Sequence, residues 1–277
     1  MRHGRAAGTA IAAALVATTI VGVAQARPSP PAAVPVLLYH QLGEPSVYSV
    51  SVASFRTQLE YLKAHEYRTI TPAQYAAWLR GGTLHVRKPI LITFDDGIAS
   101  EAKASPLLAR DGFRAVMFVV TGFATHDGYW LGWHALRSLR TSGRWEFAFH
   151  AGAHGHVKLH TSCPYFYTCE LPHETFAAYK SRVRHEVANG EATLTARTPG
   201  WSRVAWAAPF DAAGQFPAES NDPRIPAWVS RFFARRFAVV FVEERKAGRH
   251  RRYRFQVTSR TSLAAFAAAL SDPAFRR

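Results

Sequence analysis

Short apolar runs alternate along the chain with longer segments in which apolar residues recur at helical spacing. The apolar runs, which we predict to be strands, cover residues 34–39, 68–70, 90–94, 115–120, 144–149, 203–207, 238–242 and 253–257. The helices between them are predicted at residues 54–65, 71–80, 100–110, 133–140, 174–194, 228–235 and 262–270. This alternation is typical of an α/β protein with a parallel sheet covered by helices, and at this length we expect the sheet to close into a barrel.

Residues 1–26 have the pattern of a secretory signal peptide. Two arginines precede an apolar segment over residues 10–23, and the small-x-small sequence at residues 24–26 fits a cleavage site. Residues 27–33 are rich in proline and alanine and are predicted to be a linker, so the folded domain spans residues 34–277. We expect this domain to be secreted or periplasmic after cleavage, with a retained membrane anchor as the alternative.

The chain is strongly basic, with 34 Lys and Arg against 19 Asp and Glu and a formal net charge of +15. An apolar content of 48% excludes a disordered chain. The basic residues are scattered apart from a cluster at residues 245–252, and the sequence contains no nucleic-acid-binding motif. We therefore predict a solvated basic face that allows association with an anionic cell envelope, with no nucleic-acid partner and no transmembrane partner.

The predicted strand at residues 90–94 ends in Asp95, Asp96 and Gly97. Unpaired carboxylates are too costly to bury inside a sheet, so the pair must lie where the strand leaves the core. In an α/β barrel the carboxyl ends of the strands form the catalytic rim. There, one carboxylate can bind a metal while its neighbour acts as a base. A turn or a helix cap is the alternative explanation for the pair.

Three histidines, His150, His154 and His156, follow the predicted strand at residues 144–149. The spacing of the first two places both imidazoles on one side of a helical turn. With a carboxylate from another strand end, they would form a two-histidine, one-carboxylate metal site with an open position for water. A metal there would lower the pKa of water. His156 is a rival of His154 for the second position, and a histidine-rich loop without function is the alternative.

The Thr-Phe-Asp-Asp-Gly motif at residues 93–97 and the spacing from His150 to His154 resemble two motifs of the NodB-type polysaccharide deacetylases, also called carbohydrate esterase family four. Residues 34–40 are similar to the subgroup that deacetylates exported poly-N-acetylglucosamine, and the resemblance extends to about residue 270. It implies a distorted barrel of about seven strands, which agrees with the predicted alternation. It also implies a metal-dependent hydrolase that removes N-acetyl groups from an extracytoplasmic glycan containing N-acetylglucosamine.

The resemblance implies a role for each motif residue. Asp95 would act as the general base. The residues that would hold a divalent metal, with zinc the expected ion, are Asp96, His150 and His154. The residues that would line the substrate site, in place of the family's third motif, are Trp206, Pro209 and Phe210. Backbone N–H groups near Phe210 would help to stabilise the oxyanion.

Some positions depart from the family's pattern. Ala151 follows the first histidine where Ser or Thr is usual, and Asp211 replaces a more usual glycine. The sequence lacks the arginine of the third motif and the late Leu-x-His motif whose histidine serves as general acid, so the general acid is unassigned. The alternatives are therefore a catalytically impaired glycan-binding protein on the same scaffold and a polymer binder driven by charge alone.

The segment at residues 156–174 has no counterpart in the resemblance. It contains Cys163 and Cys169, which in an exported protein predict a disulfide that closes a short loop. A zinc site is the alternative for the two cysteines. The aromatic residues at 165–167 offer surfaces on which sugar rings stack, although packing within the protein is the expected role for any one of them.

Overall fold

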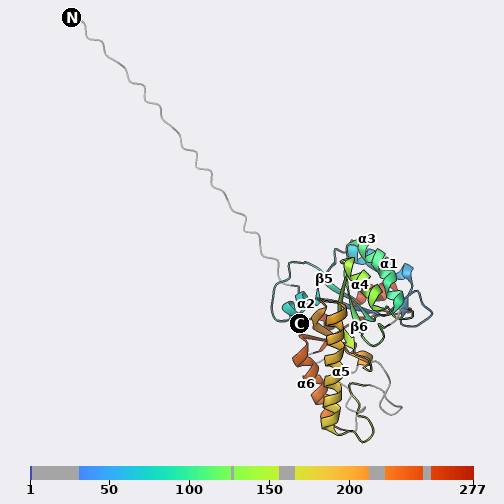
Figure 1. Cartoon of the computed structure of the whole chain (residues 1–277). Coiled ribbons are helices and arrows are strands. Elements are labelled where there is room, and N and C mark those ends of the chain that lie inside the picture. Colours follow the sequence, from blue (N-terminus) through green and yellow to red (C-terminus); the bar gives the residue numbers. More distant parts are fainter. Residues whose placement is uncertain (2–30, 126–127, 156–165, 212–221, 246–250) are drawn as a thin grey trace.

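The computed structural model describes residue 1 and residues 31–125, 128–155, 166–211, 222–245 and 251–277. Strands and helices alternate in this part of the chain (Figure 1). The strands are β1 (Val36–Tyr39), β2 (Gln41–Leu42), β3 (Ser49–Val50), β4 (Arg68–Thr69), β5 (Pro89–Asp96), β6 (Ala115–Val120), β7 (Trp145–Ala151), β8 (Ser202–Ala207), β9 (Val239–Val242), β10 (Arg251–Tyr253) and β11 (Phe255–Gln256). The helices are α1 (Val52–Ala64), α2 (Pro72–Leu79), α3 (Ser105–Asp111), α4 (Trp133–Thr141), α5 (Phe176–Arg197), α6 (Arg224–Arg236) and α7 (Leu263–Ala269).

The main sheet is parallel, with the strand order β10-β9-β8-β7-β6-β5-β1-β11 and with β4 paired to β5. Its two end strands, β10 and β11, are separated by Arg254 alone, so they form one continuous segment of chain. This segment pairs with β9 through β10 and with β1 through β11. The sheet is therefore nearly closed into a barrel, with the β10–β11 segment as the seventh strand after β1, β5, β6, β7, β8 and β9. The predicted fold class is confirmed.

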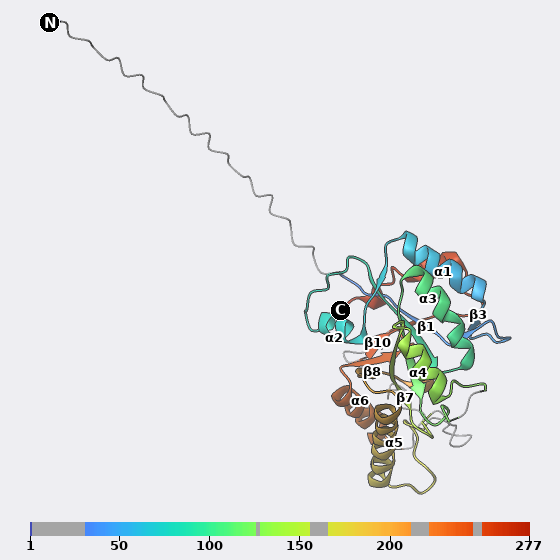
Figure 2. The ribbon, with the colours of Figure 1, turned by 45° about the horizontal axis from the view of Figure 1, so that its top comes forward.

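The inner faces of the strands form a core that fills the barrel. Leu91, Phe118 and Phe241 belong to this core. Tyr75 and Trp78 from α2 pack into the same cluster, and α2 lies near the C-terminus (Figure 2). α2 begins at the expected capping box, in which the side chains and backbone N–H groups of residues 71 and 74 bond reciprocally. Side chains thus fill the interior of the barrel at the end where α2 packs. A functional site can therefore lie only at the opposite end.

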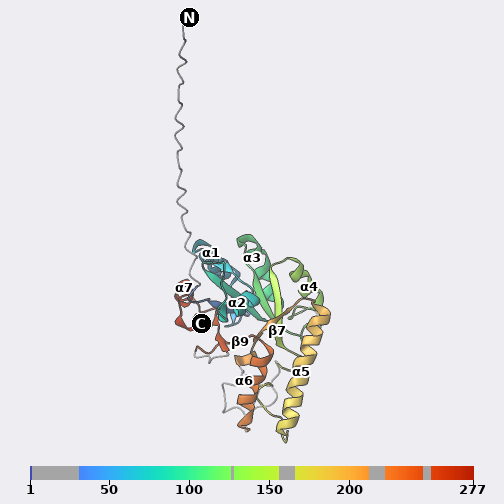
Figure 3. The same ribbon diagram turned by 90° about the vertical axis from the view of Figure 1, so that its left-hand side faces the viewer.

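A second core lies between the sheet and the outer helices. α1 and α3 lie together on one part of the sheet, whereas α5 and α6 lie side by side on another (Figures 1 and 3). Trp206 of β8 stacks on Phe233 of α6 with ring centroids 3.5 Å apart. A Cβ at Gly190 of α5 would collide with the ring of Phe149, so a glycine is needed where this helix crosses β7. These contacts fix α5 close to the end of β7.

One predicted helix differs from the structure. Residues 99–104 form a 3₁₀ helix, and α3 begins only at Ser105. The buried carboxylate of Glu101 accepts a hydrogen bond from the Ile98 N–H at 2.8 Å, and Pro106 occupies the first turn of α3, where proline is favoured. The other predicted elements agree with the structure to within a few residues at each end.

Several predictions concern residues outside the described ranges. They are the signal peptide, most of the linker, His156, and Cys163 with its disulfide. Cys169 itself is buried. None of the helices in the described ranges is long and apolar enough to cross a bilayer.

Candidate active site

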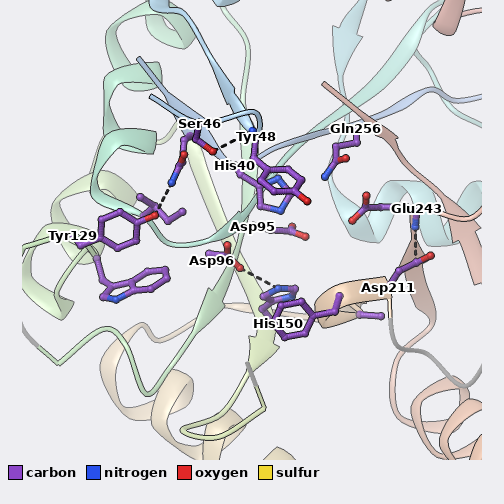
Figure 4. Close-up of a pocket in the computed structure, with 15 residues that line it drawn as sticks. His40, Ser46, Tyr48, Asp95, Asp96, Tyr129, His150, Asp211, Glu243 and Gln256 are labelled. Carbon is purple, nitrogen blue, oxygen red and sulfur yellow. Dashed lines mark hydrogen bonds and ion pairs between the residues drawn. The ribbon is translucent and has the colours of Figure 1, made fainter. Parts of the chain in front are cut away.

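A cavity of about 640 Å³ opens at the carboxyl ends of the barrel strands. Asp95 and Asp96 reach it from the end of β5, His150 from the end of β7, and Glu243 from the residue after β9 (Figure 4). His40, directly after β1, lines the same cavity. Because parallel strands share one carboxyl edge, polar residues that are remote in sequence meet here, as the sequence predicts for Asp95, Asp96 and His150.

Asp95 is held in a buried ion pair with Arg254. The guanidinium donates from Nη1 to Oδ1 and from Nη2 to Oδ2, each at 2.6 Å. Both side chains are almost fully buried, and the guanidinium lies 5.5 Å from the ring centroid of Phe118. Burial by itself raises the pKa of Asp95, but the charge and hydrogen bonds of the nearby Arg254 guanidinium hold this pKa below its usual value. Asp95 is therefore an ionised carboxylate fixed in one orientation.

Sequence reasoning missed Arg254. The expected arginine of the third motif is absent, and Arg254 supplies a guanidinium from the last barrel strand instead. Its position carried a signal, because Arg254 lies between the aromatic residues Tyr253 and Phe255 of a predicted strand. A charge at such a position is tolerated only if it is paired. The partner, however, lies 159 positions away in the chain, which no local pattern shows.

Asp96 and His150 face each other, with 3.3 Å between Asp96 Oδ1 and His150 Nε2. His150 Nδ1 lies 2.9 Å from the carbonyl oxygen of Ala207, which can only accept, so Nδ1 carries the proton and Nε2 is left as an acceptor. Two acceptors at this distance require a cation between them, either a proton or a metal. Two zinc bonds of about 2.1 Å at a tetrahedral angle span about 3.4 Å. The pair therefore fits a divalent metal.

A bulge in β7 directs the His150 side chain into the cavity. Val119 of β6 pairs with Phe149 and Val120 pairs with Ala151, so His150 is the extra residue of the bulge. The Trp206 indole donates to the His150 carbonyl oxygen at 2.8 Å and fixes the bulge from the next strand. Ala151, where the family usually has a hydroxyl side chain, is completely buried.

His154 lies apart from Asp96 and His150. Its side chain is 71% exposed and lines a different cavity, of about 920 Å³, between α5 and the ends of β6 and β7. In the described ranges, no three His, Cys, Asp or Glu side chains are grouped so as to hold a metal. The structure thus brings two of the three expected ligands together, and the role of His154 as the third stays a prediction. Its rival His156 is outside the described ranges.

Glu186 of α5 holds the loop that carries His154. Its Oε1 accepts hydrogen bonds from the backbone N–H groups of His154 and Gly155, at 2.6 and 2.8 Å. Its Oε2 lies 3.2 Å from Nδ1 of His154, which leaves Nε2 of that ring for another partner. A carboxylate that orients the second nitrogen of an imidazole is the usual neighbour of a metal-binding histidine. A Cβ at Gly152 would lie 2.5 Å from Glu186 Oε1, so the loop approaches α5 through a glycine.

The three residues predicted to line the substrate site are divided between core and cavity. Trp206 is fully buried and packs on Phe233, so it supports His150 and does not line the cavity. Pro209 is also buried. Phe210 lines the cavity and is 39% exposed. Its neighbour Asp211 has φ = 60°, which explains why a glycine is more usual at this position.

His40 and Glu243 are two titratable groups of the cavity that sequence reasoning did not assign. His40 Nδ1 is buried and has no hydrogen-bond partner within the described ranges. Burial lowers the pKa of His40, and the carboxylates of Asp96 and Asp95 oppose this effect. Burial raises the pKa of Glu243 to about 7, and Arg254 opposes this effect. The cavity thus combines ionised and neutral groups, as acid–base catalysis requires.

The rim of the cavity is aromatic. Tyr48 and Tyr129 are 51% and 58% exposed, and Phe210 is the third exposed ring. The Tyr129 hydroxyl accepts a hydrogen bond from the Gln41 amide at 2.5 Å, which fixes its orientation. In contrast, Phe166 and Tyr167 are buried and pack in the protein. Exposed rings around a polar cavity are suited to contact with sugar rings.

A parallel barrel with carboxylates and an imidazole in one cavity at its strand ends has the layout of a barrel hydrolase. Residues 85–215 match the model of the polysaccharide deacetylase family. Over these residues the chain is therefore similar to the polysaccharide deacetylases, and its resemblance to the NodB-type deacetylases is confirmed.

The curated relatives match part of the chain. The polysaccharide deacetylase YxkH of Bacillus subtilis is 31% identical over 91 residues, which are 32% of this chain and 33% of that protein. The poly-beta-1,6-N-acetyl-D-glucosamine N-deacetylase of Staphylococcus aureus is 27% identical over 108 residues, 37% of each chain. The match thus spans about a third of the length of these relatives, 33% and 37%.

Solved structures share the fold over most of the chain. IcaB from Ammonifex degensii gives a TM-score of 0.68 at 22% identity and covers 88% of this chain and 99% of its own. A de-N-acetylase from Aggregatibacter actinomycetemcomitans gives 0.68 at 17% identity, over 85% and 99%. At these identities the likeness establishes the barrel fold.

Replacing Arg254 by methionine should strongly destabilise the protein, because Asp95 would remain buried without its partner. A loss of about 3–5 kcal/mol in the free energy of unfolding is expected for such a change. Urea unfolding measures it. The double variant Asp95→Leu with Arg254→Met should regain much of this stability, since no charge is then left unpaired. An Arg254→Met protein as stable as the wild type would show that the pair is not closed in solution.

Replacing Glu186 by glutamine should loosen the His154 loop. Hydrogen bonds to a charged group contribute about 1.5–3 kcal/mol, so unfolding should become easier by this order. Hydrogen exchange should also become faster at the amides of His154 and Gly155. Glu60→Gln, on α1, is the control, because the ion pair of Glu60 with Arg110 is exposed and contributes about 0–1 kcal/mol. Equal exchange in both variants would contradict the role of Glu186.

The raised pKa of Glu243 predicts a pH-dependent contribution to stability. The pKa of Glu243 is about 7 in the folded protein, whereas the ordinary value for a glutamate is 4.5. The folded state therefore binds the proton more tightly than the unfolded state. The stabilising contribution is complete below pH 4.5 and is lost as the pH rises to about 7. The free energy of unfolding is measured with urea for the wild type and for Glu243→Gln over this pH range. We expect the wild type to lose stability relative to Glu243→Gln as the pH rises. A constant difference would contradict the assignment.

Proposed function

We propose that the protein is a metal-dependent deacetylase that removes N-acetyl groups from a polysaccharide containing N-acetylglucosamine, outside the cytoplasm. The observation that carries the proposal is the meeting of Asp95, Asp96 and His150 in one cavity at the carboxyl ends of the strands. The named activity of the Staphylococcus aureus relative supports the choice of polymer. The signal-peptide pattern at residues 1–26 supports the location.

Asp96 and His150 are the residues that would hold the metal, with His154 proposed as the third ligand and zinc as the ion. Zinc suits imidazole and carboxylate ligands and leaves a position open for water in catalytic sites. A bound divalent metal would lower the pKa of a water molecule and polarise the acetyl carbonyl.

In the proposed reaction, Asp95 accepts the proton of the attacking water. Arg254 donates one hydrogen bond to each carboxylate oxygen of Asp95, so each oxygen keeps a second lone pair that can accept a proton. The water oxygen forms a bond to the carbonyl carbon, and the bond from that carbon to nitrogen then breaks. The nitrogen takes up a proton and leaves as the free amine of the sugar, and the acetyl group leaves as acetate.

We propose His40 as the group that protonates the leaving nitrogen. It lines the cavity beside the two aspartates, and its buried Nδ1 has no hydrogen-bond partner within the described ranges. This assignment would fill the role left open by the missing late histidine motif. The backbone N–H groups near Phe210 are proposed to bind the developing oxyanion, and the rings of Tyr48, Tyr129 and Phe210 to contact the sugars.

Acetate release by the protein from residue 27 onward tests the function. N-acetylated chitooligosaccharides and poly-N-acetylglucosamine are offered with and without a chelator. We expect release that the chelator abolishes and added zinc restores. Asp95→Asn should reduce turnover by at least about 100-fold, the usual contribution of a general base, while zinc content stays unchanged. Glu60→Gln, which changes an exposed carboxylate of α1, should have wild-type activity.

Other outcomes would overturn parts of the proposal. Full activity of Asp95→Asn would remove Asp95 as the base. Oligosaccharide binding without acetate release, from a protein that contains zinc, would favour the glycan-binding alternative. Unchanged activity in the presence of the chelator would contradict metal dependence.

A further inference from the structure

The outer surface of the helix pair α5–α6 carries a small basic groove of about 260 Å³. The residues that line it, here called the arginine groove, are Arg184, Trp228, Arg231, Phe232, Arg235 and Arg236. α5 and α6 lie side by side on the side of the barrel remote from α1 and α3 (Figures 1 and 3). The arginine groove shares no residue with the catalytic cavity, so it is a separate surface.

The positive charge of the arginine groove is largely uncompensated. Within the described ranges, only Arg236 forms an ion pair, with Glu191 of α5. Arg184, Arg231 and Arg235 are exposed and have no acidic partner there. The α6 sequence, residues 224–236, contains no Asp or Glu. Like charges that line one groove repel each other, and a bound anion relieves the repulsion.

The two aromatic rings that line the groove already contact other side chains. Trp228 stacks on Phe232 with centroids 4.9 Å apart, and its edge meets the ring of Tyr179 at 5.5 Å. The Arg184 guanidinium lies 5.5 Å from the Trp228 ring. These contacts hold the Arg184 guanidinium against the rings. They also engage ring faces on which the bases of a nucleic acid would otherwise stack.

The groove is not built to enter a bilayer. An amphipathic helix that binds membranes inserts exposed apolar side chains between the lipids. The large apolar residues that are exposed in the described ranges do not include any residue of α6. Both Trp228 and Phe232 are partly buried. The ligand that the groove suits is therefore an anion that arrives in water.

We propose that the arginine groove binds the phosphate groups of a hydrated anionic polymer, a chain of phosphodiesters. Guanidinium groups match phosphate oxygens with two parallel hydrogen bonds, and several neighbouring arginines contact successive phosphates. Such binding holds the protein on a phosphate-bearing envelope polymer while the catalytic cavity, on a different surface, stays accessible. The site is independent of the proposed deacetylase activity.

The test compares two triple variants of the full chain. The first, Arg184→Gln, Arg231→Gln and Arg235→Gln, removes three charges from the groove. The control, Arg56→Gln, Arg87→Gln and Arg137→Gln, removes three charges from exposed arginines elsewhere. The probes are fluorescent poly(glycerol phosphate) and vesicles of phosphatidylcholine with phosphatidylglycerol. Fluorescence anisotropy at several salt concentrations gives the affinity for the polymer, and sedimentation gives the affinity for the vesicles.

We expect the groove variant to bind the polymer at least about tenfold more weakly than the wild type, with a salt slope reduced by about one for each lost arginine. The control should change the affinity by less than about threefold, because screened charges far from the site act weakly. An equal loss of affinity for the polymer in both variants would show that only the net charge matters, and it would overturn the proposal. Binding to the vesicles but not to the polymer would overturn it in favour of a membrane.

Two further readouts keep the result interpretable. Thermal unfolding shows whether the groove variant is folded, and the double variant Arg231→Gln with Arg235→Gln replaces it if it is not. Acetate release from a short N-acetylated oligosaccharide should be the same in the wild type and the groove variant. Loss of polymer binding with retained acetate release supports a separate site. If the wild type binds the polymer but releases no acetate, the proposed function fails and the groove stands.

Discussion

The buried ion pair between Asp95 and Arg254 is the interaction on which the site depends. Arg254 is the residue at which the last barrel strand changes its partner, from β9 on one side to β1 on the other. Its guanidinium spans the interior to Asp95 on β5, so the closure of the barrel and the neutralisation of the carboxylate are one event. Because an unpaired charge is too costly to bury, Asp95 can occupy the barrel interior only when the sheet is nearly closed.

This constraint explains the different roles of two adjacent carboxylates. Asp95 points into the barrel toward Arg254, whereas Asp96, the last residue of β5, has φ = 87° and faces His150 across the cavity. Asp95 is charged and fixed by Arg254. Asp96 faces the His150 imidazole, which presents an acceptor nitrogen to it. The bulge of β7, held by Trp206, completes the arrangement from the neighbouring strands.

The sequence predicts the structural features that depend on local patterns of residues. The strand and helix alternation, the capping box of α2, and the position of Asp95, Asp96 and His150 at strand ends follow from periodicity and from the cost of burying charge. The role of Arg254 was not predicted, because it depends on a contact with a residue 159 positions away in the chain. Trp206 was expected in the substrate site, but the structure places it in the core. The position of His154 depends on Glu186 in α5, which no spacing rule includes.

The central claim is that Asp96 and His150 hold a divalent metal in the cavity beside Asp95. Anomalous X-ray diffraction at the zinc absorption edge, from crystals grown with zinc, tests it directly. The account predicts a strong anomalous peak within bonding distance of Asp96 Oδ1 and His150 Nε2, and its third ligand would show whether His154 or His156 completes the site. A cavity without a peak, at a zinc concentration that supports acetate release, would contradict the account.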